Sequence, residues 1–219
     1  MQTIAVIPAF NEATTIAEVV TRVREILPDV VVIDDGSTDD TSARARGAGA
    51  VVLRHCVNRG LGAAIGTGLA AAWQRGADAI VTLDADGQHD PAEIPALLLP
   101  IASGTADLVI GVRGGDGAPL HRRLFHATGN IFTRALFGVR CSDTQSGFRV
   151  FHRRAVERID IRTNRMEVSS EILAEAHRHH LRIVEVPIRT IYTTYSLAKG
   201  QSFTVGVKTA WALLLRRLF

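Results

Sequence analysis

The sequence predicts an α/β fold built on a mostly parallel sheet with helices on both faces. Short aliphatic and β-branched runs alternate with helical patterns along the first half of the chain. These runs are apolar at every position, which is typical of parallel strands that are buried on both faces. Polar and acidic residues follow several of the runs, at the strand ends where ligands bind in sheets of this kind.

The expected elements follow one another in a simple order. Residues 4–7 predict the first strand, and residues 14–27 predict a helix because their apolar side chains share one face. The same alternation predicts strands at 30–33, 50–53, 79–83 and 108–110 and helices at 38–46, 61–75 and 91–102. The second half is less regular, and it predicts helices at 120–137, 169–180 and 204–218 and a strand at 183–186.

Length, composition and charge set the expected organisation. With 219 residues, 47% hydrophobic and 21% charged, the chain has the composition of a globular protein and not of a disordered one. We expect a single domain over 1–203 and a C-terminal amphipathic helix at 204–219. The net charge of +3 divides unevenly, because residues 1–110 hold 7 basic and 14 acidic side chains and residues 111–219 hold 18 and 8. The basic half therefore favours an anionic partner.

The cysteines and the termini indicate the compartment. Cys56 and Cys141 form no CxxC pair and no disulfide framework, which predicts a reducing cytoplasm. The N-terminus lacks the basic and apolar regions of a signal peptide. No segment reaches the ~20 apolar residues that a membrane span needs, so we expect no transmembrane helix.

The Asp84-Ala85-Asp86 motif follows an expected strand. Two carboxylates at a strand end can hold a hard divalent cation, Mg²⁺ or Mn²⁺, whose other positions bind diphosphate oxygens. Gln88 and His89 can add a ligand or support one. The alternative is a simple turn, in which the aspartates hydrogen-bond to the backbone and the next glycine takes a positive φ.

A second acidic loop, residues 34–41, follows the expected strand at 30–33 and opens a helix. We expect Ser37 or Thr38 to cap that helix. Capping does not explain Asp34 and Asp35, which would repel each other unless one faced a donor such as a base N–H or a ribose hydroxyl.

The glycine-rich run at 60–68 does not match a dinucleotide-binding fingerprint, because its spacing is not G-x-G-x-x-G and it does not follow the first strand. The small residues at 62, 63, 66 and 70 instead predict a helix that packs closely on the sheet. Asn58 and Arg59, just before the run, are candidates for ligand contact.

Arginines flank a glycine-rich loop in the second half. Arg113 directly follows a strand end, and Arg122 and Arg123 lie beyond the glycines. Guanidinium groups stay charged and bind phosphate oxygens in pairs. Residues 143–149 form a polar loop before a further strand. Four later arginines fit a solvated basic face instead: Arg153, Arg154, Arg158 and Arg162.

Six segments together make the sequence similar to the family-2 glycosyltransferases, which have the GT-A fold, a Rossmann-like fold of nucleotide-diphospho-sugar transferases. Within that family, residues 4 to about 199 most resemble the dolichol-phosphate mannose synthases and polyprenyl-phosphate glycosyltransferases. The segments occur in the family's order and spacing: 7–12, 32–39, 58–62, 84–89, 146–149 and 185–188.

The resemblance implies which residues form the site. It implies that the nucleotide-sugar is held by Pro8, Phe10, Glu12, Asp34, Asp35, Asp84, Ala85 and Asp86. It implies metal ligands at Asp84, Asp86 and Gln88. It implies acceptor or phosphate contacts at Arg113, Arg122, Ser146, Arg149 and Lys199. Residues 1–110 would then be the donor half and residues 111–203 the acceptor half.

The implied reaction moves a sugar with inversion from a donor of GDP-mannose or UDP-glucose type, while the metal neutralises the leaving diphosphate. Asp86, Arg113 and Arg122 would act in catalysis. A polyprenyl or dolichyl phosphate is the expected acceptor, because a phosphate with a second pKa of ~6 needs no base to remove a proton. The alternative is a hydroxyl acceptor, with Asp143 as the general base.

The expected C-terminal helix at 204–219 carries apolar residues together with Lys208, Arg216 and Arg217. This pattern predicts contact with the cytoplasmic face of a membrane, or else docking on the core or on a second subunit. Three other functions are weaker: a catalytically silent nucleotide-binding module, a nucleotidyltransferase, and a nucleic-acid binder, which would need aromatic residues for base stacking. We therefore expect no nucleic-acid partner.

Overall fold

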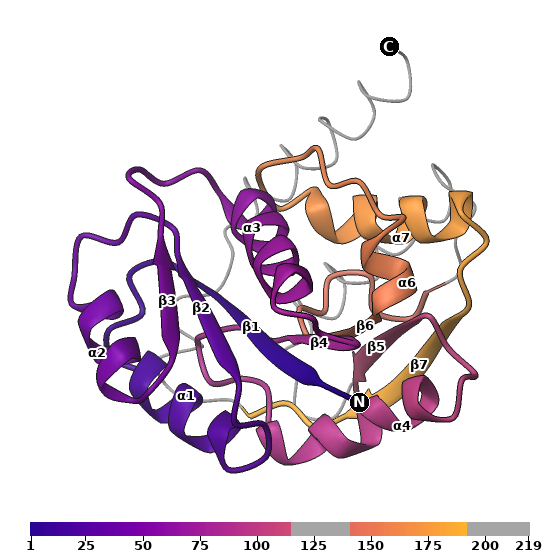
Figure 1. Cartoon of the computed structure of the whole chain (residues 1–219), viewed down its shortest axis with the longest axis horizontal. Helices are drawn as coiled ribbons and strands as arrows, with labels where there is room; N and C mark the ends of the chain where they lie inside the picture. The colour runs from indigo at the N-terminus through magenta and orange to yellow at the C-terminus, as the bar shows by residue number, and fades with distance from the viewer. Residues whose placement is uncertain (115–140, 192–219) are drawn as a thin grey trace.

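Seven strands form one sheet in residues 1–114 and 141–191, which are the residues that this computed structural model describes (Figure 1). The strands are β1 Thr3–Ala9, β2 Val30–Asp34, β3 Val51–Arg54, β4 Ala79–Thr82, β5 Leu108–Arg113, β6 Arg149–His152 and β7 Ile183–Ile188. The helices are α1 Ile16–Arg24, α2 Thr41–Gly47, α3 Leu61–Gln74, the 3₁₀ turn η1 Pro91–Glu93, α4 Ile94–Ala102, α6 Arg153–Val156 and α7 Val168–Arg178.

The sheet is parallel except at one strand. Its order is β3-β2-β1-β4-β6-β5-β7, and β6 lies antiparallel between β4 and β5. The other neighbouring pairs are parallel. The predicted α/β fold with a mostly parallel sheet is therefore confirmed. The simple alternation of strands does not reveal that β6 separates β4 from β5.

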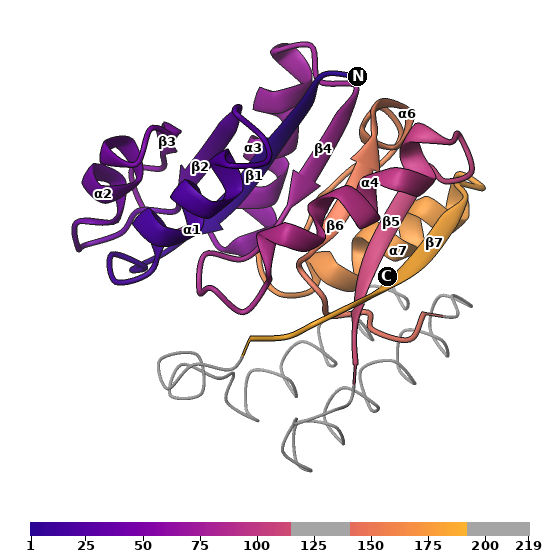
Figure 2. The ribbon, with the colours of Figure 1, turned by 90° about the horizontal axis from the view of Figure 1, so that it is seen from below.

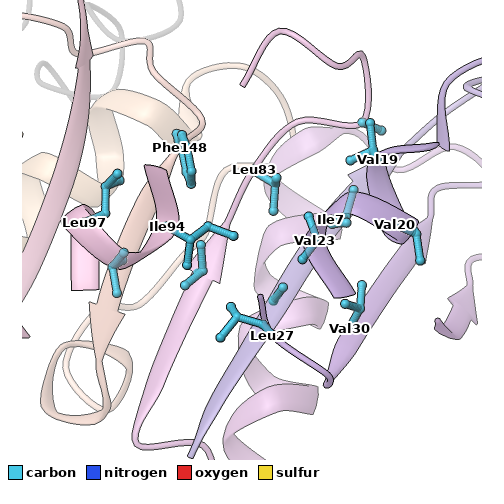
Figure 3. Packing of buried hydrophobic residues seen from close by; sticks show 14 of the residues in the cluster. Ile7, Val19, Val20, Val23, Leu27, Val30, Leu83, Ile94, Leu97 and Phe148 are labelled. Carbon is cyan, nitrogen blue, oxygen red and sulfur yellow. The ribbon is translucent and has the colours of Figure 1, made fainter. Parts of the chain in front are cut away.

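Helices cover both faces of the sheet. Helices α1, α2 and α4 lie on one face, and α3, α6 and α7 lie on the other (Figures 1 and 2). Successive residues of β1 serve the two layers, because side chains alternate along a strand. Ala5 and Ile7 join the first core cluster, and Ile4 and Val6 join the second. Figure 3 shows the first cluster, in which Val23 of α1 lies next to Ile7 and Leu97 of α4 lies on the side of Phe148.

Strand β3 corrects one expectation. The run at 50–53 was expected to be buried on both faces, but Val51 and Leu53 are 41% and 37% exposed. The reason is the position of β3 at the end of the strand order, where β2 is its one partner among the described residues.

Helix α2 corrects another expectation. It begins at Thr41 and not near residue 38, so neither Ser37 nor Thr38 is its cap. Ser37 Oγ instead accepts a hydrogen bond from the backbone N–H of Asn11 at 2.9 Å. Thr38 donates its backbone N–H to Asn11 Oδ1, also at 2.9 Å. Both residues therefore join the loop after β2 to the loop after β1.

Helix α3 packs closely on the sheet as predicted, but through partly different residues. A Cβ at Gly68 would overlap Val6 Cγ1, and one at Gly62 would overlap the Thr163 carbonyl. A Cβ at Gly66 would meet no described atom within 4 Å, and residue 70 is exposed. Gly62 and Gly68 therefore allow the close approach.

Two predicted helices, at 120–137 and 204–218, lie outside the described residues, as does the expected domain boundary at 203. The two expected halves share one sheet, since β6 and β7 of the second half pair with β4 and β5 of the first. None of the described helices is long and apolar enough to cross a membrane.

Candidate active site

One edge of the sheet gathers the predicted site residues. Strands β1, β2, β4 and β5 run in the same direction, so the loops after them leave the sheet at a common edge. Because β6 is antiparallel, its beginning lies at this edge as well. The loop at 141–148 therefore lies beside the loops of the first half.

The Asp84-Ala85-Asp86 loop leaves the sheet just after β4. The backbone N–H of Asp84 donates to His89 Nδ1 at 3.3 Å. Asp86 accepts hydrogen bonds from the Gln88 backbone N–H at 3.0 Å and from Gln88 Nε2 at 2.6 Å. The residue after Asp86 takes a φ of 76°. The hydrogen bonds of a turn are thus present, and they bring the Asp86 carboxylate and the Gln88 amide together.

The pKa values of both carboxylates in this loop are raised, so the protein disfavours two negative charges there. Burial raises the pKa of Asp84, although Arg113 and Arg149 oppose the shift. Burial also raises the pKa of Asp86, and the negative charge of Asp84 raises it further. A bound cation would offset both effects, because it favours the ionised form of each carboxylate.

The donor atoms at this edge suit a hard divalent cation. Asp84, Asp86 and Gln88 offer carboxylate and amide oxygens, the ligand type that Mg²⁺ and Mn²⁺ prefer. Within 1–114 and 141–191, no group of three or more His, Cys, Asp and Glu side chains is placed to hold a metal ion. Mg²⁺ in phosphate-transfer sites uses one or two carboxylates and takes its other ligands from substrate phosphates and water, so this small donor set fits that use.

His89 holds the backbone of this loop through a hydrogen bond and a ring contact. The side chain is buried, and burial lowers its pKa to about 4, so the ring is neutral at physiological pH. Its ring lies 5.1 Å from that of Phe148, measured between centroids. The chain after β7 also runs beside this loop, since the Ile191 N–H donates to the Gln88 carbonyl at 2.9 Å. The Nδ1 atom that accepts the Asp84 N–H makes His89 a support for the loop.

Arg113 and Asp143 form a bidentate ion pair at the same edge. Arg113 Nε lies 2.6 Å from Asp143 Oδ2, and Arg113 Nη2 lies 2.8 Å from Asp143 Oδ1. Asp143 is 4% exposed. The structure thus brings together Arg113 and Asp143, both predicted from the sequence to act in catalysis. Asp143, the candidate base, is held by the guanidinium of Arg113.

Ser146 and Arg149 are not brought to the open edge. Both are buried, and Arg149 donates to the backbone carbonyls of Thr144, Ser146 and Ser169. Burial lowers the pKa of Arg149 to about 10. The Arg149 guanidinium therefore ties the loop before β6 to α7. Because both Ser146 and Arg149 are buried, the structure does not place either of them for direct contact with a phosphate.

On the other side of the edge, the loops after β1 and β2 hold the predicted nucleotide-sugar residues. Two of these residues lie elsewhere: Pro8 is buried within β1, and Ala85 is buried in the loop after β4, between Asp84 and Asp86. Phe10 is 40% exposed at the end of β1, where an aromatic ring can contact a ligand. The backbone N–H of Glu12 donates to Thr41 Oγ1 at 2.9 Å.

The two aspartates after β2 differ. Asp34 turns inward: its carboxylate accepts the Ser37 N–H at 2.8 Å and the Ser42 hydroxyl, and these bonds hold its pKa below the usual range despite burial. Asp34 thus stabilises its own loop and is not brought to the site. Asp35 turns toward the loop after β3 and accepts the N–H groups of Arg59 at 2.9 Å and Gly60 at 2.7 Å.

His55, which follows β3, is a further residue at this edge that the sequence patterns did not predict. Its Nδ1 lies 2.7 Å from Asp35 Oδ1. The signal available in the sequence was its place: a histidine directly after a strand end, next to an acidic loop. Arg122, Arg123 and Lys199 lie outside the described residues.

The chain is similar to several known proteins. A family model described as "Glycosyl transferase family 2" matches residues 4–160. An uncharacterized protein of Methanocaldococcus jannaschii is 39% identical, over 98% of this chain and 91% of that protein. A UDP-N-acetylglucosamine–dolichyl-phosphate N-acetylglucosaminyltransferase of Methanococcus voltae is 33% identical (97% and 95%), and an undecaprenyl-phosphate mannosyltransferase of Micrococcus luteus is 31% identical (99% and 96%).

A solved structure shares the fold. It is glucosyl-3-phosphoglycerate synthase from Mycobacterium tuberculosis in complex with Mn²⁺, UDP-glucose and phosphoglyceric acid. The TM-score is 0.80 at 24% identity, and the alignment covers 99% of this chain and 79% of that one.

Proposed function

The chain belongs to glycosyl transferase family 2, and we propose that it transfers a sugar from a nucleotide-sugar to the phosphate of a polyprenyl or dolichyl lipid. It is a glycosyltransferase of GT-A fold, as predicted. The observation that carries the proposal is the joint position of the Asp84–Asp86 loop and the Arg113–Asp143 pair at one sheet edge.

The donor side of the proposal rests on the acidic loops. We assign a divalent cation to Asp84, Asp86 and Gln88, whose oxygens suit Mg²⁺ or Mn²⁺. We assign the nucleoside to the edge near Phe10 and Asp35. The related fold that binds Mn²⁺ with UDP-glucose supports this assignment.

The acceptor side rests on the pairing of Asp143. A hydroxyl acceptor needs a general base, and the candidate base Asp143 is engaged by Arg113 through both carboxylate oxygens. A phosphate acceptor needs no base, because it is already ionised. Two relatives that cover nearly the whole chain are named for dolichyl phosphate and undecaprenyl phosphate, and they differ in the sugar. We therefore propose the acceptor class and leave the sugar open.

The proposed step is one displacement. A phosphate oxygen of the acceptor forms a bond to the anomeric carbon, the bond from that carbon to the donor diphosphate breaks, and the nucleoside diphosphate leaves with its electron pair. When bound, the cation supplies positive charge to the leaving diphosphate. Asp84 and Asp86 would hold this cation, and Asp143 orients the guanidinium of Arg113 toward the acceptor.

Acceptor choice tests the proposal. The full chain would be incubated with Mn²⁺ and labelled GDP-mannose, UDP-glucose or UDP-N-acetylglucosamine, together with undecaprenyl or dolichyl phosphate in detergent. We expect label in the organic extract with at least one donor. Transfer to soluble sugars alone would replace the lipid phosphate by a hydroxyl acceptor. A wild-type chain that neither transfers nor hydrolyses any donor would point to a silent nucleotide-binding module.

We also propose that residues 1–203 act as one catalytic domain and that residues 204–219 contact the cytoplasmic face of a membrane. The second statement rests on sequence alone, since 192–219 lie outside the described residues. A lipid-phosphate acceptor requires the enzyme to work at a membrane surface, and an amphipathic cationic segment supplies such contact.

A further inference from the structure

A buried histidine links the nucleoside side of the site to helix α3. His55 is 9% exposed at the end of β3, and its backbone N–H donates to the Asp34 carbonyl at 2.9 Å. Its Nδ1 lies 2.7 Å from Asp35 Oδ1, and its Nε2 lies 3.0 Å from the hydroxyl of Thr67 on α3. Both ring nitrogens are therefore engaged inside the protein.

The two contacts of His55 lie on opposite sides of its ring. The Asp35 carboxylate oxygen accepts from Nδ1. The Thr67 hydroxyl, which can donate or accept, bonds to Nε2. Thr67, His55 and Asp35 thus form one chain of hydrogen bonds, in which Thr67 holds the ring and the ring holds the carboxylate.

Asp35 retains one acceptor position. A carboxylate offers about four acceptor positions, and the described partners of Asp35 use three of them. His55 and Arg59 bond to Oδ1, and Gly60 bonds to Oδ2. One position on Oδ2 remains, on a residue that lies at the site edge and is 4% exposed.

We propose that His55, held by Thr67, is a positioning residue that fixes Asp35 for the nucleobase of the donor. The proposal rests on the proposed nucleotide-sugar function. The remaining position on Oδ2 accepts a ring N–H, which uracil and guanine present at their pairing edge and which adenine and cytosine lack there. Without His55, the Asp35 carboxylate loses the one side chain among its described partners and keeps two backbone N–H groups, so it is held less firmly in that orientation.

The test compares three single variants, and the double variant of His55→Leu with Thr67→Val, with the wild-type chain. His55→Leu removes both hydrogen bonds, Thr67→Val removes only the hydroxyl, and His55→Asn keeps an N–H donor near the place of Nδ1. The probes are UDP, GDP, ADP and CDP with Mn²⁺, and Mn²⁺ with inorganic diphosphate, which has no base. Dissociation constants would be measured by calorimetry.

One of UDP and GDP will bind the wild-type chain more tightly. We expect His55→Leu to weaken the binding of that nucleotide by about tenfold, the size of a lost hydrogen bond to a charged group. Binding of Mn²⁺ with diphosphate stays unchanged. His55→Asn recovers most of the lost affinity. Thr67→Val causes a smaller loss, and it has no further effect in the His55→Leu background because the two residues act through one contact.

Two controls match the variants in chemistry. His177→Leu changes an exposed histidine on α7, and Thr21→Val removes an exposed hydroxyl on α1 that donates to the Ala17 carbonyl at 2.8 Å. Both keep wild-type affinity for every probe.

The outcomes separate the inference from the proposed function. Wild-type affinity of His55→Leu for UDP and GDP would overturn the role of His55 alone. Equal losses for UDP and for diphosphate would also overturn it, because they indicate a general loss of structure. A wild-type chain that binds neither UDP nor GDP would overturn the proposed function, and the role of His55 with it.

Discussion

At the scale of single residues, Gly147 lies against Asp84 where the two halves of the chain meet. The Thr82 hydroxyl donates to the Gly147 carbonyl at 2.9 Å. A Cβ at Gly147 would overlap the Asp84 carboxylate. The absence of a side chain at position 147 therefore lets the second half of the chain close on the proposed metal loop.

Gly147→Ala should displace the Asp84 carboxylate. We expect Mn²⁺-dependent binding of UDP or GDP to weaken by about tenfold or more, because misplacement of a site group by about 1 Å costs up to about 100-fold. Calorimetric titration with and without Mn²⁺ measures the effect. Gly114→Ala is the matched control, since no described atom lies within 4 Å of a Cβ at that position. Equal metal dependence in the two variants would contradict the prediction.

Asp143→Asn separates two roles of this residue. If Asp143 only orients Arg113, the variant should raise the KM for the lipid phosphate while kcat falls by less than about tenfold. A lost general base would lower kcat by about 100-fold or more and remove the acidic limb of its pH profile. Steady-state kinetics across pH decide between them. Asp29→Asn, on the exposed turn before β2, is the control and should leave both constants unchanged.

At the scale of elements, helix α3 depends on a glycine. Gly68→Ala would press a methyl group against Val6 and, at 3.2 Å, against Ile33 Cγ1. We expect a loss of about 1–3 kcal/mol in the free energy of unfolding, the usual cost of overpacking a core. Urea denaturation measures it. Gly66→Ala, in the same helix, meets open space and should gain up to about 1 kcal/mol from helix propensity. A loss of equal size in both variants would mean that close packing is not the cause.

An ion pair links the two residues that directly precede the paired strands β5 and β7. Asp107 is buried and accepts from Arg182 Nε and Nη2, each at 2.9 Å, and from the Arg182 backbone N–H, also at 2.9 Å. These bonds lower the pKa of Asp107 from 3.8 to about 2. Because the folded-state pKa lies below the unfolded one, the pair stabilises the fold fully above pH 4, and this contribution disappears as the pH falls toward 2.

Asp107→Asn should therefore lower the free energy of unfolding by about 1–2 kcal/mol at neutral pH, a value reduced for the half-exposed Arg182. The difference from wild type should shrink between pH 4 and pH 2. Denaturation curves at several pH values test this. Asp160→Asn breaks an exposed pair with Arg162 and should change stability by less than about 0.5 kcal/mol. A difference for Asp107→Asn that does not change with pH would contradict the assignment.

At the scale of the whole molecule, the uneven distribution of charge agrees with different proposed roles for the two halves of the chain. The acidic first half supplies the carboxylates of the proposed cation site, and the second half has an excess of arginine and lysine. Some of these arginines have structural roles, as Arg149 and Arg182 do. Others lie in the C-terminal segment, whose charges we propose to face an anionic membrane.

Neutralising that segment in the full chain tests the membrane proposal. The triple change of Lys208, Arg216 and Arg217 to Gln should weaken co-sedimentation with vesicles that contain phosphatidylserine, at about 1 kcal/mol per charge. Binding of the wild-type chain should fall with added salt. The same number of changes at Arg44, Arg46 and Arg75, which lie at the ends of α2 and α3, is the control. Equal binding by both triple variants would remove the membrane contact from the proposal.

Much of the architecture was predictable from the sequence alone. The runs of β-branched residues and the one-sided apolar pattern at 14–27 identified β1 and α1, because these patterns act over a few residues. The six motifs likewise identified the family and the acidic loop at 84–89. Boundaries were less exact: α1 ends at Arg24, and β7 continues to Ile188.

Only the tertiary structure decided how these parts meet. The place of β6 between β4 and β5 depends on pairing between residues about 70 positions apart, for which a local pattern carries no signal. That pairing brings Gly147 to Asp84. Burial likewise decided that Asp34 and Arg149 bond within their own loops and that His55 reaches Asp35. The sequence by itself determined which chemical groups are present, and the packing of distant segments decided which of them face the site.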